Sequence, residues 1–192
     1  MNKELVDSLY KQVKKIKDAD IQKFTNLALD HAPPEFWIAP CSSSGHHHPP
    51  EDNGEGGVMR HLIKGIYMSL ELARFFSISE TNTDIVVSGY ILHDIQKNGI
   101  PWGNKTDDTH GKIASLWLMQ FPLKEPEKEA ICNCVRYHMG QWVQPEEEVI
   151  RALHPTKNEL IVQLTDYVCS REYASFLPGR SLSKRVIKNY KL

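Results

Sequence analysis

Apolar side chains recur at intervals of three and four residues along nearly the whole chain, and no segment sustains the alternating pattern of a strand. The clearest case is residues 58–76, where Val58, Leu62 and Gly65 share one helical face with a histidine, His61. No internal repeat is visible, and 192 residues are enough for one domain with a sizeable core. The chain is therefore predicted to fold as a single all-α domain.

Proline, glycine and polar clusters divide this pattern into separate segments. We expect helices over about 3–16, 19–31, 58–76, 82–96, 109–121, 126–139, 145–153 and 157–175. A loop at about 39–57 is rich in Ser, His, Pro and Gly, and loops of this length are usually functional or disordered. The final stretch, RSLSKRVIKNYKL, is expected to be a helix with a solvated basic face, and a nucleic-acid contact is the alternative.

The overall composition favours no charged partner. Charged residues make up 24% of the chain and the formal net charge is -1, so no global field attracts nucleic acid or an anionic membrane. No apolar run approaches the roughly 20 residues of a membrane span, and the start is a charged amphipathic segment, so we expect a cytoplasmic protein without a membrane partner. The four cysteines are few and unevenly spaced, which argues against a disulfide framework or a cysteine zinc clamp.

Metal-capable side chains stand on or beside the apolar face of several segments, where an uncompensated polar group would be costly to bury. They are His61, His93, Asp94, His110, His138 and Asp166. Imidazoles and carboxylates suit borderline and hard divalent ions, and six such ligands are enough for two ions. The sequence therefore predicts a buried site for two divalent metal ions, with Mn, Fe, Ni, Co, Zn and Mg all left open.

Such a pair of ions would support phosphoryl chemistry. Two ions can polarise a phosphoryl oxygen, lower the pKa of a bound water and hold the attacking and leaving oxygens of an in-line displacement. Asp94 could bridge them. Lys97 lies one helical turn after His93 and could pair with a phosphate as a point charge. We therefore assign catalytic roles to Asp94 and Lys97.

The order of these residues resembles the HD-domain superfamily of metal-dependent phosphohydrolases, in its binuclear form. The matching stretches are GGVMRH (56–61), LHDIQK (92–97), DDTHG (107–111), RYHMG (136–140) and LTDY (164–167). The resemblance covers roughly residues 45–175. It implies a helical bundle, with residues 1–38 as an N-terminal helical extension and 178–192 as a basic C-terminal tail.

The resemblance also implies ligand roles. In that family the first His, the HD doublet and the last Asp bind one ion, the two middle histidines bind a second, and the doublet Asp bridges. Many members have Gly at the position of Gln96. Because Gln is the better helix former, we expect the helix to run on through Lys97.

Further residues are candidates for substrate binding. Some exoribonuclease-like HD-domain proteins have a similar His-containing stretch before the first ligand. We therefore expect the loop with His46, His47 and His48 to lie over the site, and a solvated loop is the alternative.

Two arginines are candidate phosphate contacts. Arg136 flanks His138, together with Gln141 and Trp142, and an indole offers a face for a base. Arg171 lies five residues after Asp166, and a surface salt bridge is its alternative role.

The leading interpretation is a hydrolase that uses a metal-activated water on a phosphomonoester or phosphodiester, in a nucleotide or short oligonucleotide. An alternative is a di-iron oxygenase similar to myo-inositol oxygenase, acting on a small polyol or phosphonate-like substrate. A second alternative is a non-catalytic domain that senses a nucleotide. The sequence does not indicate the oligomeric state.

Overall fold

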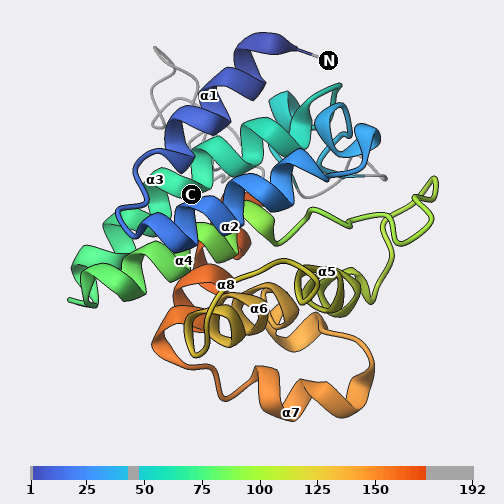
Figure 1. Ribbon diagram of the computed structural model, residues 1–192. Helices are drawn as coiled ribbons and strands as arrows, with labels where there is room; N and C mark the ends of the chain where they lie inside the picture. The colour runs from blue at the N-terminus through green and yellow to red at the C-terminus, as the bar shows by residue number, and fades with distance from the viewer. Residues whose placement is uncertain (1, 43–47, 172–192) are drawn as a thin grey trace, which may run out of the picture.

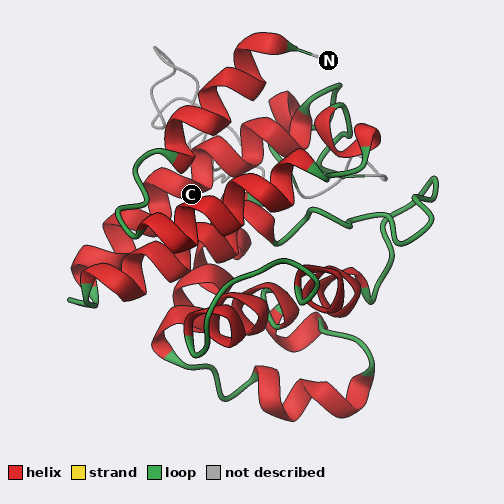
Figure 2. Cartoon of the chain, in the orientation of Figure 1, coloured by secondary structure: helices red, strands yellow, loops and turns green. Residues whose placement is uncertain are grey.

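The computed structural model describes residues 2–42 and 48–171, which form helices joined by loops (Figures 1 and 2). Within these ranges the chain has no strand, so the all-α prediction is confirmed. The helices are α1 (Lys3–Val13), α2 (Ala19–Asp30), α3 (Gly57–Phe75), α4 (Glu80–Leu92), α5 (His110–Leu118), α6 (Glu127–Arg136), α7 (Val149–Ala152) and α8 (Lys157–Cys169). Short 3₁₀ turns are η1 (Pro34–Trp37), η2 (Pro50–Asp52), η3 (Gly140–Trp142) and η4 (Glu146–Glu148).

Helix α4 lies at the centre of the bundle. It packs against α2, α3, α6 and α8, and every residue from 84 to 92 is buried (Figure 1). A helix that is apolar on all sides must be surrounded by other elements. The end of α4 therefore lies among side chains from α3, α6 and α8, and α5 packs on α6.

Two glycines allow the close helix contacts that the site requires. A Cβ atom at Gly65 of α3 would lie 2.0 Å from the Tyr90 hydroxyl of α4. A Cβ atom at Gly111 of α5 would lie 2.8 Å from the Arg136 carbonyl oxygen at the end of α6. Glycine at these positions brings His61 close to α4 and His110 close to α6.

The α1–α2 connection is held to the bundle by a buried carboxylate. Asp84 on α4 accepts hydrogen bonds from the backbone N–H groups of Lys17 and Asp18, at 3.1 and 2.8 Å. Asp18 in turn caps α2, because its side chain accepts from the N–H groups of Asp20 and Ile21. The N-terminal helices are thereby fixed against α3 and α4.

One helix boundary was predicted wrongly. The helix expected over 82–96 ends at Leu92, and residues 93–100 form consecutive turns. The Nδ1 atom of His93 lies 2.6 Å from the Tyr90 carbonyl oxygen, which is the acceptor that the Asp94 N–H would need in order to continue the helix. Hydrogen bonding between a side chain and the local backbone competes with the helix, so Gln96 does not extend α4 through Lys97.

The remaining boundaries agree with expectation to within a few residues. The helix expected over 157–175 is observed up to Cys169, and residues 172–175 lie outside the described part of the chain, as does the basic tail. Over the residues described, the helices are too short or too polar to cross a membrane. The cytoplasmic location stays a prediction.

Candidate metal centre

Five helices deliver the six predicted ligand residues to one place. His61 lies on α3, His93 and Asp94 follow α4 directly, His110 begins α5, His138 follows α6, and Asp166 lies on α8. The side chain of Asp166 is 22% exposed, and the other five residues are almost completely buried. These residues are distant in sequence, so packing of α3, α4, α6 and α8 brings them together.

On one side of the cluster, histidines face the carboxylate of Asp166. His61 Nε2 lies 3.0 Å from Asp166 Oδ1, and His93 Nε2 lies 3.5 Å from the same oxygen. Ligand atoms of His61, His93 and Asp166 all lie within 4.8 Å of one another. The three side chains could hold one metal ion.

On the other side, histidines face Asp94. His110 Nε2 lies 3.2 Å from Asp94 Oδ1, and His93 Nε2 lies 3.6 Å from Asp94 Oδ2. Ligand atoms of His93, Asp94 and His138 form a second group within 4.8 Å. His93 belongs to both groups, so the two potential ion sites are adjacent.

Three of the imidazoles are held in the same way. The Nδ1 atoms of His93, His110 and His138 donate to the carbonyl oxygens of Tyr90, Asp107 and Val135, at 2.6, 2.7 and 2.7 Å. Each acceptor is three residues earlier in the chain. Because a carbonyl can only accept, Nδ1 carries the proton and the lone pair of Nε2 points into the cluster. This is the orientation in which histidine binds a metal ion.

The contact between two of these imidazoles is suited to a cation. His110 Nε2 and His138 Nε2 lie only 3.0 Å apart, although each ring already places its proton on Nδ1. Two nitrogen lone pairs at this distance repel each other unless both interact with the same proton or metal ion. Burial and the neighbouring His93 and His110 lower the pKa of His138 to about 3, which disfavours protonation of the His138 imidazole.

The carboxylates are ionised in this environment. Burial raises the pKa of Asp94, but Lys97, His93 and His110 outweigh it and hold the pKa well below its ordinary value. The pKa of Asp166 is likewise lowered, because His61 and His93 outweigh its burial. Conversely, burial lowers the pKa of His93, yet Asp94 and Asp166 raise it overall. The cluster therefore favours positive charge at its centre.

His61 is held differently, by a residue that sequence analysis did not identify. The Tyr90 hydroxyl lies 3.0 Å from His61 Nε2, the same atom that faces Asp166. Within the described residues, His61 Nδ1 is buried and has no hydrogen-bond partner. Tyr90 lies three residues before His93, and that helical spacing could have indicated it.

A third group of potential ligands joins this edge. Ligand atoms of Cys41, His48 and His61 lie within 4.8 Å of one another, and the rings of His48 and His61 are 5.3 Å apart. Burial and the neighbouring His61 lower the pKa of His48 to about 3, so its imidazole is neutral. Of the three loop histidines, His48 thus lies beside the cluster, whereas His46 and His47 fall outside the described residues. The sequence prediction did not include Cys41.

Lys97 is bound to Asp94. Its Nζ atom lies 2.6 Å from Asp94 Oδ2, and the side chain is buried. Burial lowers the pKa of Lys97, but the Asp94 carboxylate outweighs it and raises the pKa overall. The ammonium group is therefore a positive charge placed directly against the cluster.

The two predicted arginine contacts lie in different surroundings. Arg136 binds Glu148 through Nε and Nη2, at 2.8 and 2.6 Å, and Lys112 also contacts Glu148 at 3.2 Å. Arg171 instead stacks on the ring of Tyr167, with its guanidinium carbon 4.4 Å from the ring centroid. Arg171 lines a pocket beside the cluster, and Arg136 does not.

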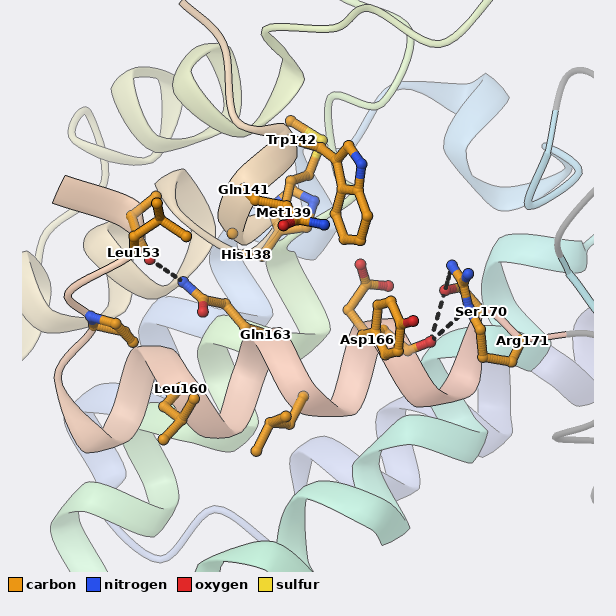
Figure 3. Close-up of a pocket in the computed structure, with 15 residues that line it drawn as sticks. His138, Met139, Gln141, Trp142, Leu153, Leu160, Gln163, Asp166, Ser170 and Arg171 are labelled. Carbon is orange, nitrogen blue, oxygen red and sulfur yellow. Dashed lines mark hydrogen bonds between the residues drawn. The ribbon is translucent and has the colours of Figure 1, made fainter. Parts of the chain in front are cut away.

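The pocket has a volume of about 560 Å³ and opens onto the candidate metal centre. His138 and Asp166 line it together with Gln141 and Trp142, and α8 forms its floor (Figure 3). Its volume lies within the range of roughly 300 to 1,000 Å³ that is common for small-molecule sites. A substrate bound here would touch one residue from each ligand group.

Comparison with known proteins gives one match. The family model described as HD domain matches residues 58–170, which is more than half of the chain. No curated protein and no solved structure matches the chain. The matched range includes all six predicted ligand residues.

Proposed function

The chain belongs to the HD-domain superfamily of metal-dependent hydrolases, and on that premise we propose that it is a phosphohydrolase. The proposed reaction is attack of a metal-activated water on a phosphomonoester or phosphodiester, in a nucleotide or short oligonucleotide. One observation carries the proposal most directly. The Nε2 atoms of His110 and His138 face each other at 3.0 Å, and both Nδ1 atoms already donate to backbone carbonyls, an arrangement that a divalent ion would satisfy.

The donor set fits two divalent ions. We propose that they are held by His61, His93, Asp94, His110, His138 and Asp166. Bound there, the ions would supply an activated water and electrostatic stabilisation of the phosphoryl oxygens. Imidazole and carboxylate ligands are compatible with Mn, Fe, Ni, Co, Zn or Mg.

The protein residues would have separate tasks. Asp94 would act as the carboxylate ligand shared by the two ions, since it contacts His93, which also faces Asp166, and His110, which faces His138. Lys97 would offer its ammonium to the substrate phosphate once a metal ion neutralises Asp94. Arg171 and His48, at the edges of the cluster, would contact the substrate.

The lining of the pocket favours hydrolysis over the oxygenase alternative. A small polyol needs many hydrogen-bond partners, whereas much of this lining is apolar or aromatic, including Met139, Leu153, Leu160 and Trp142. The ligand set alone suits either reaction. A non-catalytic, nucleotide-sensing role is the third possibility, and the same experiment separates all three.

We also propose that the chain is one domain. Helix α1 packs on α3, and α2 packs on α4, so the N-terminal helices share the core of the metal-binding bundle.

The test is metal analysis of the purified protein, followed by a manganese-supplemented assay on a generic phosphodiester and a panel of nucleotides. Wild type should bind up to two ions and release product. His93→Ala and Asp94→Ala should bind less metal and lose roughly 10³-fold in activity, which corresponds to about 4 kcal/mol of transition-state stabilisation. His154→Ala, which replaces an exposed histidine outside the cluster, is the matched control.

Equal metal content in wild type and both cluster variants would disprove the site. Two bound ions without hydrolysis, but with oxygen consumption and a mixed-valence di-iron signal, would favour the oxygenase. Two ions with nucleotide binding and no turnover would favour a sensor.

A further inference from the structure

Two large aromatic side chains are exposed at the mouth of the pocket. Trp142 on η3 is 55% exposed and Tyr167 on α8 is 43% exposed. Their rings are nearly parallel, with an interplanar angle of 6° and centroids 5.8 Å apart. Exposed aromatic surface beside a pocket is a common mark of a ligand-binding site, because burying it against a flat ligand is favourable.

One member of the pair, Tyr167, is held in position by Arg171. The Arg171 guanidinium stacks on the Tyr167 ring, and its Nε atom donates to the Tyr167 carbonyl oxygen at 3.1 Å. Its Nη2 atom donates to Ser170 Oγ at 3.0 Å. These contacts restrict the motion of Tyr167, so less side-chain entropy is lost when a ligand binds.

A hydrogen-bond acceptor lies one helical turn away on the same face of α8. Gln163 Nε2 donates to the carbonyl oxygens of Tyr137 and Ala152, at 2.9 and 3.1 Å. With both N–H groups used, the amide is fixed and its Oε1 atom is the remaining polar group on this pocket-lining side chain. It could accept an N–H from the edge of a planar ring.

The same face of α8 also carries Asp166, which lies between Gln163 and Tyr167 in sequence and turns its carboxylate towards Trp142 (Figure 3). A phosphate at the candidate metal centre would thus be adjacent to a flat, partly apolar surface. We propose that Trp142 and Tyr167 form a stacking wall that binds the nucleobase of a nucleotide substrate while its phosphate lies at Asp166 and His138. This inference rests on the proposed function and names the substrate group that the pocket selects.

Binding of the base is tested without catalysis. Adenosine and cytidine, which have no phosphate, are titrated into the protein in EDTA and followed by saturation-transfer NMR, with ribose 5-phosphate as the probe that lacks a base. With the wild-type protein, saturation should be transferred more strongly to the base protons of the nucleosides than to their ribose protons. Trp142→Ala should weaken nucleoside binding roughly tenfold, about 1.4 kcal/mol, which is within the range for one stacked base.

Two variants complete the experiment. Trp142→Phe keeps an aromatic face and should stay within about threefold of wild type. Phe75→Ala removes an aromatic side chain that is 80% exposed but does not line the pocket, and it should bind nucleosides as wild type does. Undetectable nucleoside binding to wild type, or equal binding to wild type and Trp142→Ala, would overturn the stacking wall.

Phosphate release from adenosine 5′-monophosphate and ribose 5-phosphate, with manganese, separates this inference from the proposed function. Trp142-dependent nucleoside binding, without hydrolysis of either ester or of the generic phosphodiester, would support the wall and refute the hydrolase. Release from both esters at equal kcat/KM, unchanged in Trp142→Ala, would support the hydrolase and refute the wall.

Discussion

Asp84 and Asp94 are both buried carboxylates, one within α4 and one just beyond its end, yet their surroundings are different. Asp84 accepts from two backbone amides, those of Lys17 and Asp18, at 3.1 and 2.8 Å. Asp94 instead meets side chains, with Lys97 Nζ at 2.6 Å and His110 Nε2 at 3.2 Å. Backbone amides cannot leave or change their charge, whereas an ammonium group and imidazoles can move or exchange a proton for a metal ion.

The difference separates a structural carboxylate from a functional one. A buried charge must be compensated in either case. At Asp84 the compensation is permanent, so the residue ties the α1–α2 connection to α4. At Asp94 the compensation is replaceable, so the same chemistry yields a site that can accept a cation. Three experiments test this difference between the two carboxylates.

The largest effect is expected from Lys97→Met. In the metal-free protein this change removes a buried ammonium group from a buried carboxylate, which typically costs about 3 to 5 kcal/mol. Manganese should restore most of the lost stability, because the ion replaces Lys97 as the counter-charge of Asp94. Urea denaturation in EDTA and in manganese measures both states. An equal loss in the two conditions would show that Lys97 does not compensate the metal-binding carboxylate.

Asp84→Ala should destabilise the protein by about 2 kcal/mol, because it removes the buried acceptor of two partly buried N–H groups. Metal content should stay at the wild-type value. Asp84→Asn keeps one acceptor oxygen and serves as the milder control, with an expected loss of about 1 kcal/mol. Loss of metal in Asp84→Ala, measured on the folded fraction, would contradict the division between the two carboxylates.

Acidification should have the smallest effect between pH 7 and pH 5. His138 and His48 have pKa values lowered to about 3 in the folded protein. Below about pH 6.5 these residues bind protons in the unfolded chain but not in the folded one, so the free energy of unfolding falls as the pH drops. His93 acts in the opposite direction, because its raised pKa stabilises the folded form below about 6.5 and that contribution is lost as the pH rises. The stabilisation from Asp94 and Asp166, whose pKa values are lowered, persists above about pH 4 and is lost below it.

The net expectation is a loss of stability on going from pH 7 to pH 5, because two imidazoles with lowered pKa values outweigh one with a raised pKa, followed by a steeper loss below about pH 4. Urea denaturation at several pH values in EDTA measures it. His138→Gln should flatten the decline between pH 7 and pH 5. A rise in stability over that interval would mean that His93 dominates the cluster.

Several features of the fold followed from local pattern. The spacing of apolar residues predicted an all-α chain, because helical periodicity depends only on neighbours three and four residues away. His61, His93 and Asp94 stood out because polar groups on an apolar stripe must be compensated. The family match then confirmed the superfamily that the order of these residues resembled.

Other features depended on contacts between distant residues. The sequence carried no sign that Arg136 pairs with Glu148, and the spacing of Tyr90 before His93 gave only its helical face, not its contact with His61. It also predicted that α4 continues through Lys97, because helix propensity ignores the bond from His93 to the Tyr90 carbonyl.

Local sequence pattern is thus enough to predict the helices and the chemical types available to the site. Which atoms meet depends on how the helices pack. Among them are the two Nε2 lone pairs of His110 and His138, the replaceable partner of Asp94, and the exposed faces of Trp142 and Tyr167. The physical reason is that propensity and periodicity are local, whereas compensation of a buried charge depends on every element packed around it.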